Sequence, residues 1–363
     1  MSRIIAIGTA VPAHKHQQEN IRQFMQQVYA MNETDKRKLK FLYHQSGIDT
    51  RYSVVADYSK TIHDWKFYPQ SENLEPFPTL ETRMTWFNKY APPLSVDAIR
   101  KCIDGHIQSK EITHLITVSC TGMSAPGLDL QVMELMDLPK NIYRSSVNFM
   151  GCYAAIHAMK IADAICKHDT SAKVVIVCTE LCTLHFQKEP TADNIASGLL
   201  FADGAAAMLI THDSYHKNGL HIDSFYAEVV PKGKKDMAWE LSGTGFLMTL
   251  SGYVPELIEE DFESLVNRAL DHAQKTKQDI TGWCIHPGGK RIIDTIARTM
   301  QLPPTALQAS YDTMRQYGNM SSPTILFVLK QLLQQQQNEK AEIFGAAFGP
   351  GLTMETFCLS GNQ

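Results

Sequence analysis

Residues 145–160 read SSVNFMGCYAAIHAMK, and this stretch decides how the rest of the chain is interpreted. A strand-like apolar run leads to Gly151, which permits a tight turn, and the residues after Cys152 carry apolar side chains at helical spacing. The stretch therefore predicts a strand, a turn and a helix, with a cysteine at the helix start. A cysteine there is either a small buried hydrophobe or a nucleophile, because the positive end of the helix dipole favours the thiolate.

The composition is that of a globular protein without a nucleic-acid partner. The chain has 363 residues, of which 44% are hydrophobic and 20% charged, and this length suits two domains or one large double domain. A formal net charge of −4 is unlike the basic surface that nucleic-acid binding needs. No uncharged apolar stretch reaches the ~18 residues of a transmembrane helix, and the N-terminus lacks a secretory pattern. We expect a cytoplasmic protein with no membrane span.

The eight cysteines do not indicate disulfides or a metal site. None of them forms a CxxC pair, and a large intracellular chain has little need of disulfides. Cys178 and Cys182 have a tolerable spacing for zinc, but no second pair of ligands accompanies them. We expect no metal, and we expect buried packing for the cysteines other than Cys152, which are Cys102, Cys120, Cys166, Cys178, Cys182, Cys284 and Cys358.

Short apolar runs alternate with longer segments of helical periodicity along the chain. Strands are expected at residues 4–8, 114–120, 173–179, 205–212, 221–229, 282–287 and 342–360. Helices are expected at residues 94–110, 127–137, 152–168, 255–275, 289–300 and 321–337. Strands that are apolar on both faces and are separated by helices predict an α/β layered fold with covered sheets.

The two halves of the chain are similar at this coarse level, which predicts an internal duplication. Each half has a strand–turn–helix unit near its middle and ends in two closely spaced strands. The polar stretch 212–219 is the expected boundary, which gives halves of 1–215 and 216–363. Residues 50–92, where several prolines occur, are expected to form a long irregular excursion.

Two later stretches place polar side chains at junctions similar to that of the cysteine. His286 ends an apolar strand and precedes Pro287, two glycines and a helix. Asn319 lies in a Gly-Asn turn before a helix that Pro323 opens. Ligand sites of α/β folds form where strands end, so Cys152, His286 and Asn319 are candidate catalytic residues.

Six short motifs occur along the chain, namely TGMSAPGLDLQ at 121–131, GCYAA around Cys152, LLFADGAAAMLI at 199–210, IHPGGKRI around His286, YGNMSS around Asn319 and FGPG at 348–351. This ordered set resembles the type III polyketide synthases, the chalcone synthase-like branch of the thiolase-fold condensing enzymes. The resemblance covers nearly the whole chain. It implies an α/β, thiolase-like layered αβαβα fold from two duplicated halves, in which 1–215 carries the nucleophilic cysteine and 216–363 the histidine and the asparagine.

The resemblance implies a role for each of the three residues. Cys152 would carry the acyl starter and then the growing chain as a thioester. His286 would hold the thiol, whose ordinary pKa is ~8.5, as a thiolate through an ion pair. His286 and Asn319 would donate hydrogen bonds to the thioester carbonyl of malonyl-CoA, where one donor contributes roughly 3–4 kcal/mol to stabilising the enolate. The resemblance implies acyl-CoA and malonyl-CoA as substrates, no further cofactor, and a homodimer.

A substrate cavity is implied in the same way. Phe201 would be an aromatic gate between the CoA tunnel and the cavity, and Met248 occupies the place of a second gate. Glycines of the FGPG motif would form part of the wall, because glycine lets the backbone approach a substrate closely. The residues implied for the starter pocket and this wall are Cys120, Thr121, His185, Gly349 and Gly351.

The expected mouth of the CoA tunnel departs from the family pattern. Lys38, Gly288 and Arg291 are the candidate CoA contacts, while Phe41 and Gln45 stand where basic residues are expected. A run of charges such as the one around Lys38 is also typical of a solvated helix face.

Three other functions stay open at this point. A ketoacyl-ACP synthase III-type enzyme also uses Cys, His and Asn, but it takes an acyl carrier protein and condenses once. A 3-hydroxy-3-methylglutaryl-CoA synthase needs an acidic base near the cysteine, for which Glu180 is the candidate. A catalytically silent thiolase-fold binding protein has no reason to keep all three residues. The motifs FGPG and YGNMSS favour a polyketide synthase that forms a pyrone, resorcinol or phloroglucinol, and we expect an aliphatic acyl or malonyl starter.

Overall fold

The computed structural model describes residues 1–363 apart from 30, 216–217, 304, 336–339 and 362–363, and nine of its strands form one sheet. The strand order is β11-β12-β13-β8-β1-β7-β6-β4-β5. β1 (Ser2–Ala10) pairs antiparallel with β7 (Asp203–His212) along its length, but it pairs with β8 (Leu220–Val229) only at Arg3 and Ile4. The sheet therefore consists of two parts that meet at a narrow contact.

Each part of the sheet comes from one half of the chain. The N-terminal part consists of β1, β7, β4 (His114–Ser119), β5 (Tyr143–Asn148) and β6 (Lys173–Leu181), with β4 parallel to both β5 and β6. The C-terminal part consists of β8, β11 (Gly282–Ile285), β12 (Ala341–Gly349) and β13 (Thr353–Gly361), with β11 parallel to β12. The expected strands are confirmed, and the expected segment 342–360 is a hairpin of two strands.

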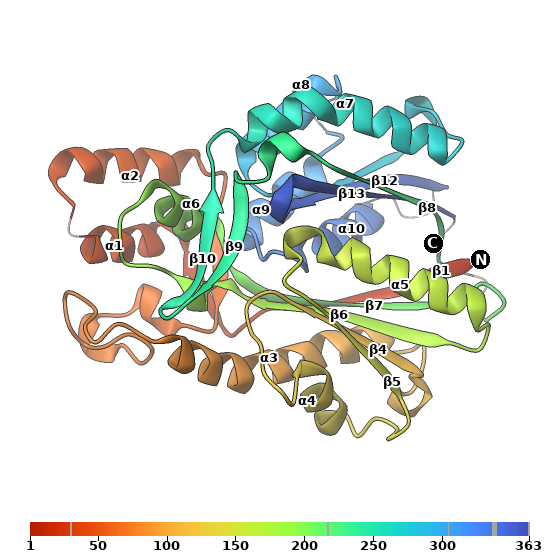
Figure 1. Ribbon diagram of the computed structural model, residues 1–363, viewed down its shortest axis with the longest axis horizontal. Coiled ribbons are helices and arrows are strands. Elements are labelled where there is room, and N and C mark those ends of the chain that lie inside the picture. Colours follow the sequence, from red (N-terminus) through yellow and green to blue (C-terminus); the bar gives the residue numbers. More distant parts are fainter. Residues whose placement is uncertain (30, 216–217, 304, 336–339, 362–363) are drawn as a thin grey trace.

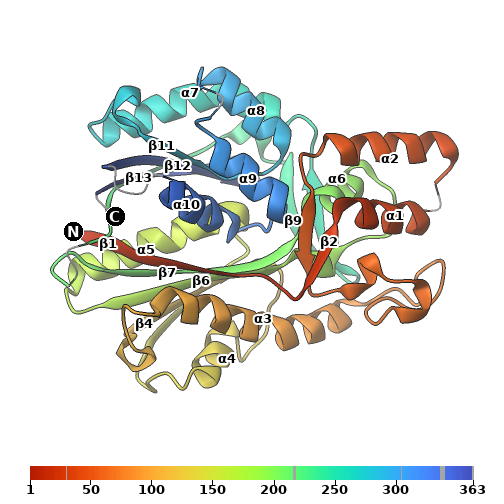
Figure 2. The ribbon, with the colours of Figure 1, turned by 180° about the vertical axis from the view of Figure 1, so that it is seen from behind.

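Helices lie outside and between the two parts of the sheet, as Figures 1 and 2 show. One outer layer contains α3 (Leu80–Ile103) and α4 (Leu128–Leu135), and the other contains α7 (Val254–His272) and α8 (Lys290–Thr299). The central layer contains α5 (Ala154–His168) and α10 (Thr324–Gln335). This arrangement confirms the α/β, thiolase-like αβαβα fold. The expected helix 321–337 extends into residues outside the described part of the chain.

The remaining elements gather at one end of the layers, on the left in Figure 1. They are α1 (Gln18–Val28), α2 (Glu33–Gln45), α6 (Ala192–Leu200), the antiparallel pair β2 (His14–Gln17) and β3 (Thr50–Ser53), and the hairpin of β9 (Met237–Ser242) and β10 (Gly245–Leu250). α9 (Gln308–Tyr317) lies nearer the middle, beside α10. Short 3-10 helices connect several elements, at Ala56–Ser59, Ile62–Asp64, Ser109–Glu111, Gly151–Tyr153, Cys182–His185, Pro231–Gly233, Lys277–Asp279 and Pro350–Leu352.

The expectation of an irregular excursion over residues 50–92 is wrong in its last part. α3 begins at Leu80, where the Thr79 side chain caps the helix by accepting a hydrogen bond from the Thr82 backbone N–H, and it continues through Pro92 and Pro93. A proline inside a helix costs about 3 kcal/mol or more. The helix persists because one face is buried against the sheet along its length, and burial of apolar surface offsets that cost.

The contact between α3 and β1 is too close for any side chain on the strand. A Cβ built on Gly8 would lie 2.2 Å from the carbonyl oxygen of Ala98 and 2.4 Å from the backbone nitrogen of Cys102. Cys102 itself is buried, and so are the six other cysteines that the sequence assigns to packing, although Cys120 and Cys182 also line a pocket. Within the described parts of the chain, every helix is too short or too polar to span a bilayer.

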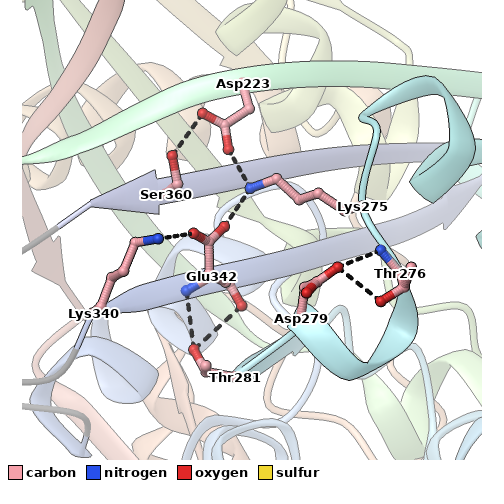
Figure 3. Close-up of polar contacts among 8 residues, drawn as sticks. All are labelled: Asp223, Lys275, Thr276, Asp279, Thr281, Lys340, Glu342 and Ser360. Carbon is pink, nitrogen blue, oxygen red and sulfur yellow. Dashed lines mark hydrogen bonds and ion pairs between the residues drawn. The ribbon is translucent and has the colours of Figure 1, made fainter.

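Polar side chains join three strands at the far end of the C-terminal part of the sheet (Figure 3). Lys275 donates to Asp223 on β8 at 2.7 Å and also to Glu342 on β12. Ser360 on β13 donates to the other oxygen of Asp223 at 2.8 Å, and Lys340 pairs with Glu342 at 3.0 Å. This network fixes the start of β12, whose other end leads to Pro350.

We predict that Gly8→Ala lowers the free energy of unfolding, because the added methyl group collides with the α3 backbone. The usual cost of overpacking a core is about 1–3 kcal/mol, and we expect a loss of this size or larger. Urea unfolding followed by circular dichroism measures the difference. Gly243→Ala is the matched control, since a Cβ there meets no atom within 4 Å and the expected change is within about 0.5 kcal/mol. Equal unfolding midpoints for the two variants would contradict this packing.

Candidate active site

Cys152 lies in the one-turn helix Gly151–Tyr153, between the end of β5 and the start of α5. Gly151 has φ +78°, and a Cβ on it would lie 2.2 Å from the Cδ of Pro350, so only glycine fits this turn. The Gly151 backbone N–H donates to the sulfur of Cys120 at 3.0 Å. These contacts hold Cys152 at the junction that the sequence predicts, and its side chain is half-buried.

Asn319 reaches the same place from the C-terminal half. It follows Gly318, whose φ is +69°, at the end of α9. Its backbone pairs with the segment around Phe201, because its N–H donates to the Leu200 carbonyl at 2.9 Å and its own carbonyl accepts from the Ala202 N–H at 2.8 Å. A short piece of backbone pairing therefore connects the asparagine turn to the expected gate residue.

The starts of the two central helices face each other at the cysteine. The Cys152 thiol donates to the Ser321 hydroxyl at a sulfur–oxygen distance of 3.6 Å, and the Asn319 side chain lies near enough to lower the pKa of this thiol. The Asn319 side-chain oxygen accepts the Ser321 backbone N–H at 2.8 Å, which fixes the amide. The structure thus brings Cys152 and Asn319 together across the two halves of the chain.

His286 occupies the turn after β11 beside the asparagine. Its backbone N–H donates to the Ala346 carbonyl at 2.9 Å, and its own carbonyl accepts the Gly288 N–H at 2.9 Å. The Asn319 amide in turn reaches the Gly288 carbonyl at 3.4 Å. The imidazole of His286 is 1% exposed, and neither ring nitrogen has a hydrogen-bond partner among the described residues. Both ring nitrogens are therefore uncommitted within the described part of the chain.

Burial opposes charge on both the cysteine and the histidine. It raises the pKa of Cys152 to about 12, where the Glu180 carboxylate adds to the increase, and it lowers the pKa of His286 to about 3. No hydrogen bond or ion pair joins Cys152 to His286 among the described residues. The expected thiolate–imidazolium pair therefore stays a prediction, and it requires mutual attraction that overcomes the burial of both groups.

Cys152 opens on a small pocket of about 30 Å³. Four of the cavity residues expected from the sequence line it, which are Cys120, Thr121, Phe201 and Met248. The other lining residues are Gly151, Cys182, Met237, Trp239, Ser321 and Pro350. A thiol at the end of an apolar pocket, with amide and imidazole donors on neighbouring turns, suits a nucleophile that forms a thioester.

Family models match almost the entire chain. Residues 1–214 match the N-terminal domain of chalcone and stilbene synthases, and residues 221–362 match the C-terminal domain of the same enzymes. The chain belongs to the chalcone and stilbene synthase family. This family comprises the type III polyketide synthases, which are acyltransferases that condense acyl groups with loss of carbon dioxide.

Individual relatives agree with this assignment. The chain is 29% identical over 362 residues to probable polyketide synthase 1 of Dictyostelium discoideum. The aligned region covers 98% of this chain but only 11% of that much longer protein. It is 27% identical to type III polyketide synthase C of Arabidopsis thaliana, with 98% of this chain and 94% of that protein covered. The crystal structure of the C-terminal type III polyketide synthase domain of Steely1, a type I/III hybrid from Dictyostelium, superposes with a TM-score of 0.91 at 26% identity, covering 100% and 99% of the two chains.

His185 is absent from the Cys152 pocket of this synthase and connects two parts of its wall. Its Nδ1 accepts the Phe246 backbone N–H at 3.1 Å, so Nε2 carries the proton and donates to the Thr121 carbonyl at 2.7 Å. The ring stacks on Phe246 with centroids 4.3 Å apart. Burial lowers the pKa of His185 to about 3, which keeps this bridge neutral. These bonds hold β10 against the Thr121 loop, and because His185 also lines the adjoining chamber that shares Phe201 and Met248 with this pocket, its expected place in the starter pocket stays a prediction.

The FGPG motif contributes its proline to the pocket. Pro350 lines it, whereas Gly349 and Gly351 are not among the lining residues. A Cβ on Gly349 would lie 2.4 Å from the Tyr153 ring, and Gly351 has φ +75° in the following turn. These glycines permit close packing and a left-handed turn, and their expected approach to substrate stays a prediction.

Two of the three candidate CoA contacts lie in one groove. Gly288 and Arg291 line a groove of about 250 Å³ together with Leu42, Leu199, Leu200, Leu250, Pro255 and Lys290. Lys38 is not among its lining residues, and it pairs with Asp35 at 3.2 Å on the exposed face of α2. The interpretation of the charged run as a solvated helix face fits Lys38 better than a tunnel contact does.

Sequence reasoning missed Trp239, although a turn signal was available. Trp239 lines the Cys152 pocket, and its indole N–H donates to the Cys120 carbonyl at 2.7 Å. It lies on β9, and the stretch SGTG at 242–245 turns the chain into β10, which carries Met248. Glycine-rich turns between alternating residues indicate a hairpin. Recognising this hairpin would have placed Trp239 and Met248 on one wall.

Glu180 is close to the cysteine but is engaged in structural hydrogen bonds. The side chain is fully buried and accepts from the Cys120 N–H at 2.9 Å, the Thr121 hydroxyl at 2.8 Å and the Ser322 hydroxyl at 2.6 Å. Burial raises its pKa to about 7. Glu180 therefore holds the loop of Cys120 to the turn before α10. Because these hydrogen bonds engage its carboxylate, Glu180 is poorly suited to be the general base that a 3-hydroxy-3-methylglutaryl-CoA synthase needs.

We predict that His286→Ala leaves the Cys152 thiol with the high pKa that burial sets, because the attraction to an imidazolium is lost. Inactivation by iodoacetamide should slow more than about tenfold at pH 7 and then rise about tenfold for each pH unit up to pH 9, since only the thiolate reacts. In the wild type, the rate of inactivation by iodoacetamide should rise at lower pH than in the variant. Superimposable pH profiles for the two proteins would rule out the ion pair.

Proposed function

We propose that this enzyme loads an acyl group from acyl-CoA on Cys152, extends it by decarboxylative condensation with malonyl-CoA, and cyclises the product. The observation that carries the proposal is the meeting of Cys152 and Asn319 at the facing starts of α5 and α10, with His286 on the adjoining turn. We further propose that 1–215 and 216–363 are the two duplicated halves, each contributing one central helix.

The proposed chemistry uses the three residues in sequence. The Cys152 sulfur, with its proton taken and kept by His286, attacks the acyl-CoA carbonyl and expels CoA as its thiolate, which leaves an acyl thioester on Cys152. Malonyl-CoA then loses carbon dioxide while Asn319 and protonated His286 donate to its thioester carbonyl. The resulting enolate carbon attacks the acyl carbonyl and releases the cysteine. The extended chain remains on CoA until Cys152 accepts it again.

Burial suits these steps. The Cys152 pocket is largely apolar, and a donor there faces little competition from water. The groove of Gly288 and Arg291 begins beside the Asn319 turn, which is a suitable route for the pantetheine arm of CoA. Decarboxylation generates the carbon nucleophile, so we propose no cofactor beyond the CoA thioesters. The products that fit are a pyrone, a resorcinol or a phloroglucinol.

The alternatives carry less support. A single-condensation enzyme of the ketoacyl-ACP synthase III type shares Cys, His and Asn but is not the family that matches this chain. A silent binding protein does not require Cys152 to lie at the turn of Asn319, with His286 on the next turn. The eight free thiols fit a reducing compartment, and we propose the cytoplasm.

We predict that the purified protein releases carbon dioxide from malonyl-CoA and forms polyketides, and that Cys152→Ala abolishes the polyketides because no thioester can form. Asn319→Ala should slow malonyl-CoA decarboxylation by roughly 100-fold, as expected for loss of one oxyanion donor. Scintillation counting of carbon dioxide and mass spectrometry of products are the measurements. Cys166→Ala, a buried cysteine at the other end of α5, is the matched control and should retain both activities. Polyketide formation by Cys152→Ala would overturn the mechanism.

We also propose a homodimer, because β5 is the edge strand of the sheet and most of its residues are exposed. Exposed edge strands are prone to pair with another chain. Size-exclusion chromatography with light scattering should give twice the mass of a 40.8 kDa chain. Ser145→Pro should weaken the dimer, because Ser145 is exposed on this edge strand. Val147 is not used for this test, since its side chain is buried. A wild-type monomer at micromolar concentration would contradict the proposal.

A further inference from the structure

Three cysteines line one pocket, although the proposed reaction uses only Cys152. Cys120 and Cys182 border the same space, and its volume of about 30 Å³ suits a molecule of the size of water or hydrogen peroxide. The three residues come from different parts of the fold, because Cys120 follows β4, Cys182 follows β6 and Cys152 precedes α5. Further thiols are therefore present in the space where Cys152 reacts.

Cys120 has a direct contact with the turn of Cys152. Its sulfur accepts the Gly151 N–H at 3.0 Å, and Gly151 directly precedes Cys152 in the chain. A backbone nitrogen is about 1.5 Å from its own Cα and consecutive Cα atoms are about 3.8 Å apart, so this sulfur lies at most about 8 Å from the Cys152 Cα. Both side chains also border the same small pocket. Rotation of the Cys152 side chain is therefore the main movement that a bond between the two sulfurs requires.

The Cys120 sulfur differs from the thiols that fill the core. Those of Cys102, Cys166 and Cys284 donate to backbone carbonyls at 3.4 Å, 3.6 Å and 3.6 Å. The Cys120 sulfur instead accepts a hydrogen bond in the pocket. Burial raises the pKa of Cys120, and the Gly151 N–H opposes this rise because it favours the thiolate. The Cys120 sulfur is thus held in a position and a state that suit attack on another sulfur.

We propose that Cys152 and Cys120 form a disulfide when the enzyme meets hydrogen peroxide, and that this bond blocks the nucleophile reversibly. The proposal goes beyond the synthesis of polyketides and assigns a modification site to the pocket. It rests on the proposed function in one respect, since peroxide reacts with the thiolate that forms when His286 takes the Cys152 proton.

The modification takes two steps. The Cys152 thiolate attacks one oxygen of hydrogen peroxide, the O–O bond breaks, and a sulfenic acid forms on Cys152. The other oxygen leaves as hydroxide and takes the proton held by His286, which gives water. The Cys120 sulfur then attacks the Cys152 sulfur, the S–O bond breaks, and the departing hydroxide combines with the Cys120 proton to give a second water. Two thiols are oxidised to a disulfide, and the peroxide is reduced to water.

The disulfide has two consequences for the enzyme. It stops acyl loading, because the Cys152 sulfur is no longer a nucleophile. It also prevents further oxidation of Cys152 to sulfinic acid, which thiol reductants do not reverse. Dithiothreitol should restore both thiols by exchange. In a reducing compartment such a bond forms only under oxidative conditions, which suits a temporary block.

Mass spectrometry after peroxide treatment tests the bridge without relying on activity. The protein is treated with hydrogen peroxide, its remaining thiols are alkylated in denaturant, and it is digested without reductant. The wild type should give the peptide of Cys152 joined to that of Cys120. A bridge from Cys152 to Cys182, or a Cys152 that stays reduced, would overturn the proposal.

Cys120→Ser removes the second thiol and keeps an acceptor for the Gly151 N–H, since a hydroxyl also accepts. In this variant Cys152 should become sulfinic acid, and dithiothreitol should restore almost none of the lost polyketide synthesis. The wild type should recover most of it. Recovery is expressed relative to the same protein before oxidation, so that a change in basal activity cancels.

Cys182→Ser is the matched control. Cys182 lines the same pocket, but within the described part of the chain no hydrogen bond joins its sulfur to the turn of Cys152. This variant should form the bridge and recover as the wild type does. Equal recovery in the wild type and Cys120→Ser would contradict the inference. A protein that makes no polyketide before oxidation would instead contradict the proposed function, whereas an active enzyme without the bridge contradicts this inference alone.

Discussion

The packing of Gly151 against Pro350 is the contact on which the active site depends. Gly151 ends the connection from β5, and Pro350 directly follows β12, so this contact joins the two halves of the chain directly beside Cys152. A side chain at Gly151 would force the halves apart and separate Cys152 from Ser321. The backbone pairing of Phe201 with Asn319 is a second crossing of the same boundary. The site therefore exists only where the two parts of the sheet are held in one register.

Burial then determines the electrostatics of this junction. His286 and Glu180 are removed from water and Cys152 is half-buried, and burial drives each of the three toward its neutral form. Charge that develops in such an environment is stabilised mainly by the few donors within reach, because solvent contributes little. Neutral His185 and the acceptor role of Glu180 keep the walls fixed while these charges form. The fold thus supplies preorganised donors, and the substrate supplies the charge.

Much of this arrangement could be predicted from short-range signals in the sequence. The junctions of Cys152, His286 and Asn319 follow from apolar strands, glycine turns and helical periodicity, which are local properties. Residues that depend on long-range contacts were harder to assign. Pro92 and Pro93 look like helix breakers until α3 is seen against the sheet, and the two hydrogen bonds of His185 join segments that are far apart in the sequence.

Trp239 and Arg51 illustrate the same limit at the cavity. Nothing in the local sequence places a tryptophan of β9 against the carbonyl of Cys120, or an arginine of β3 under Phe201. Both contacts span more than 100 residues and depend on which elements pack together. Cavity shape is accordingly a property of the tertiary fold, whereas the reaction class is visible in the motifs.

The central claim is that Cys152 carries the acyl chain, and mass spectrometry of the acylated enzyme tests it most directly. The protein is incubated with an acyl-CoA starter, quenched in acid, digested and searched for the starter mass on each cysteine peptide. The account predicts a thioester on the peptide of Cys152 and none on those of Cys120 or Cys182, which line the same pocket but are more deeply buried than Cys152. An acyl group on Cys120 or Cys182, or on no cysteine at all, would contradict it.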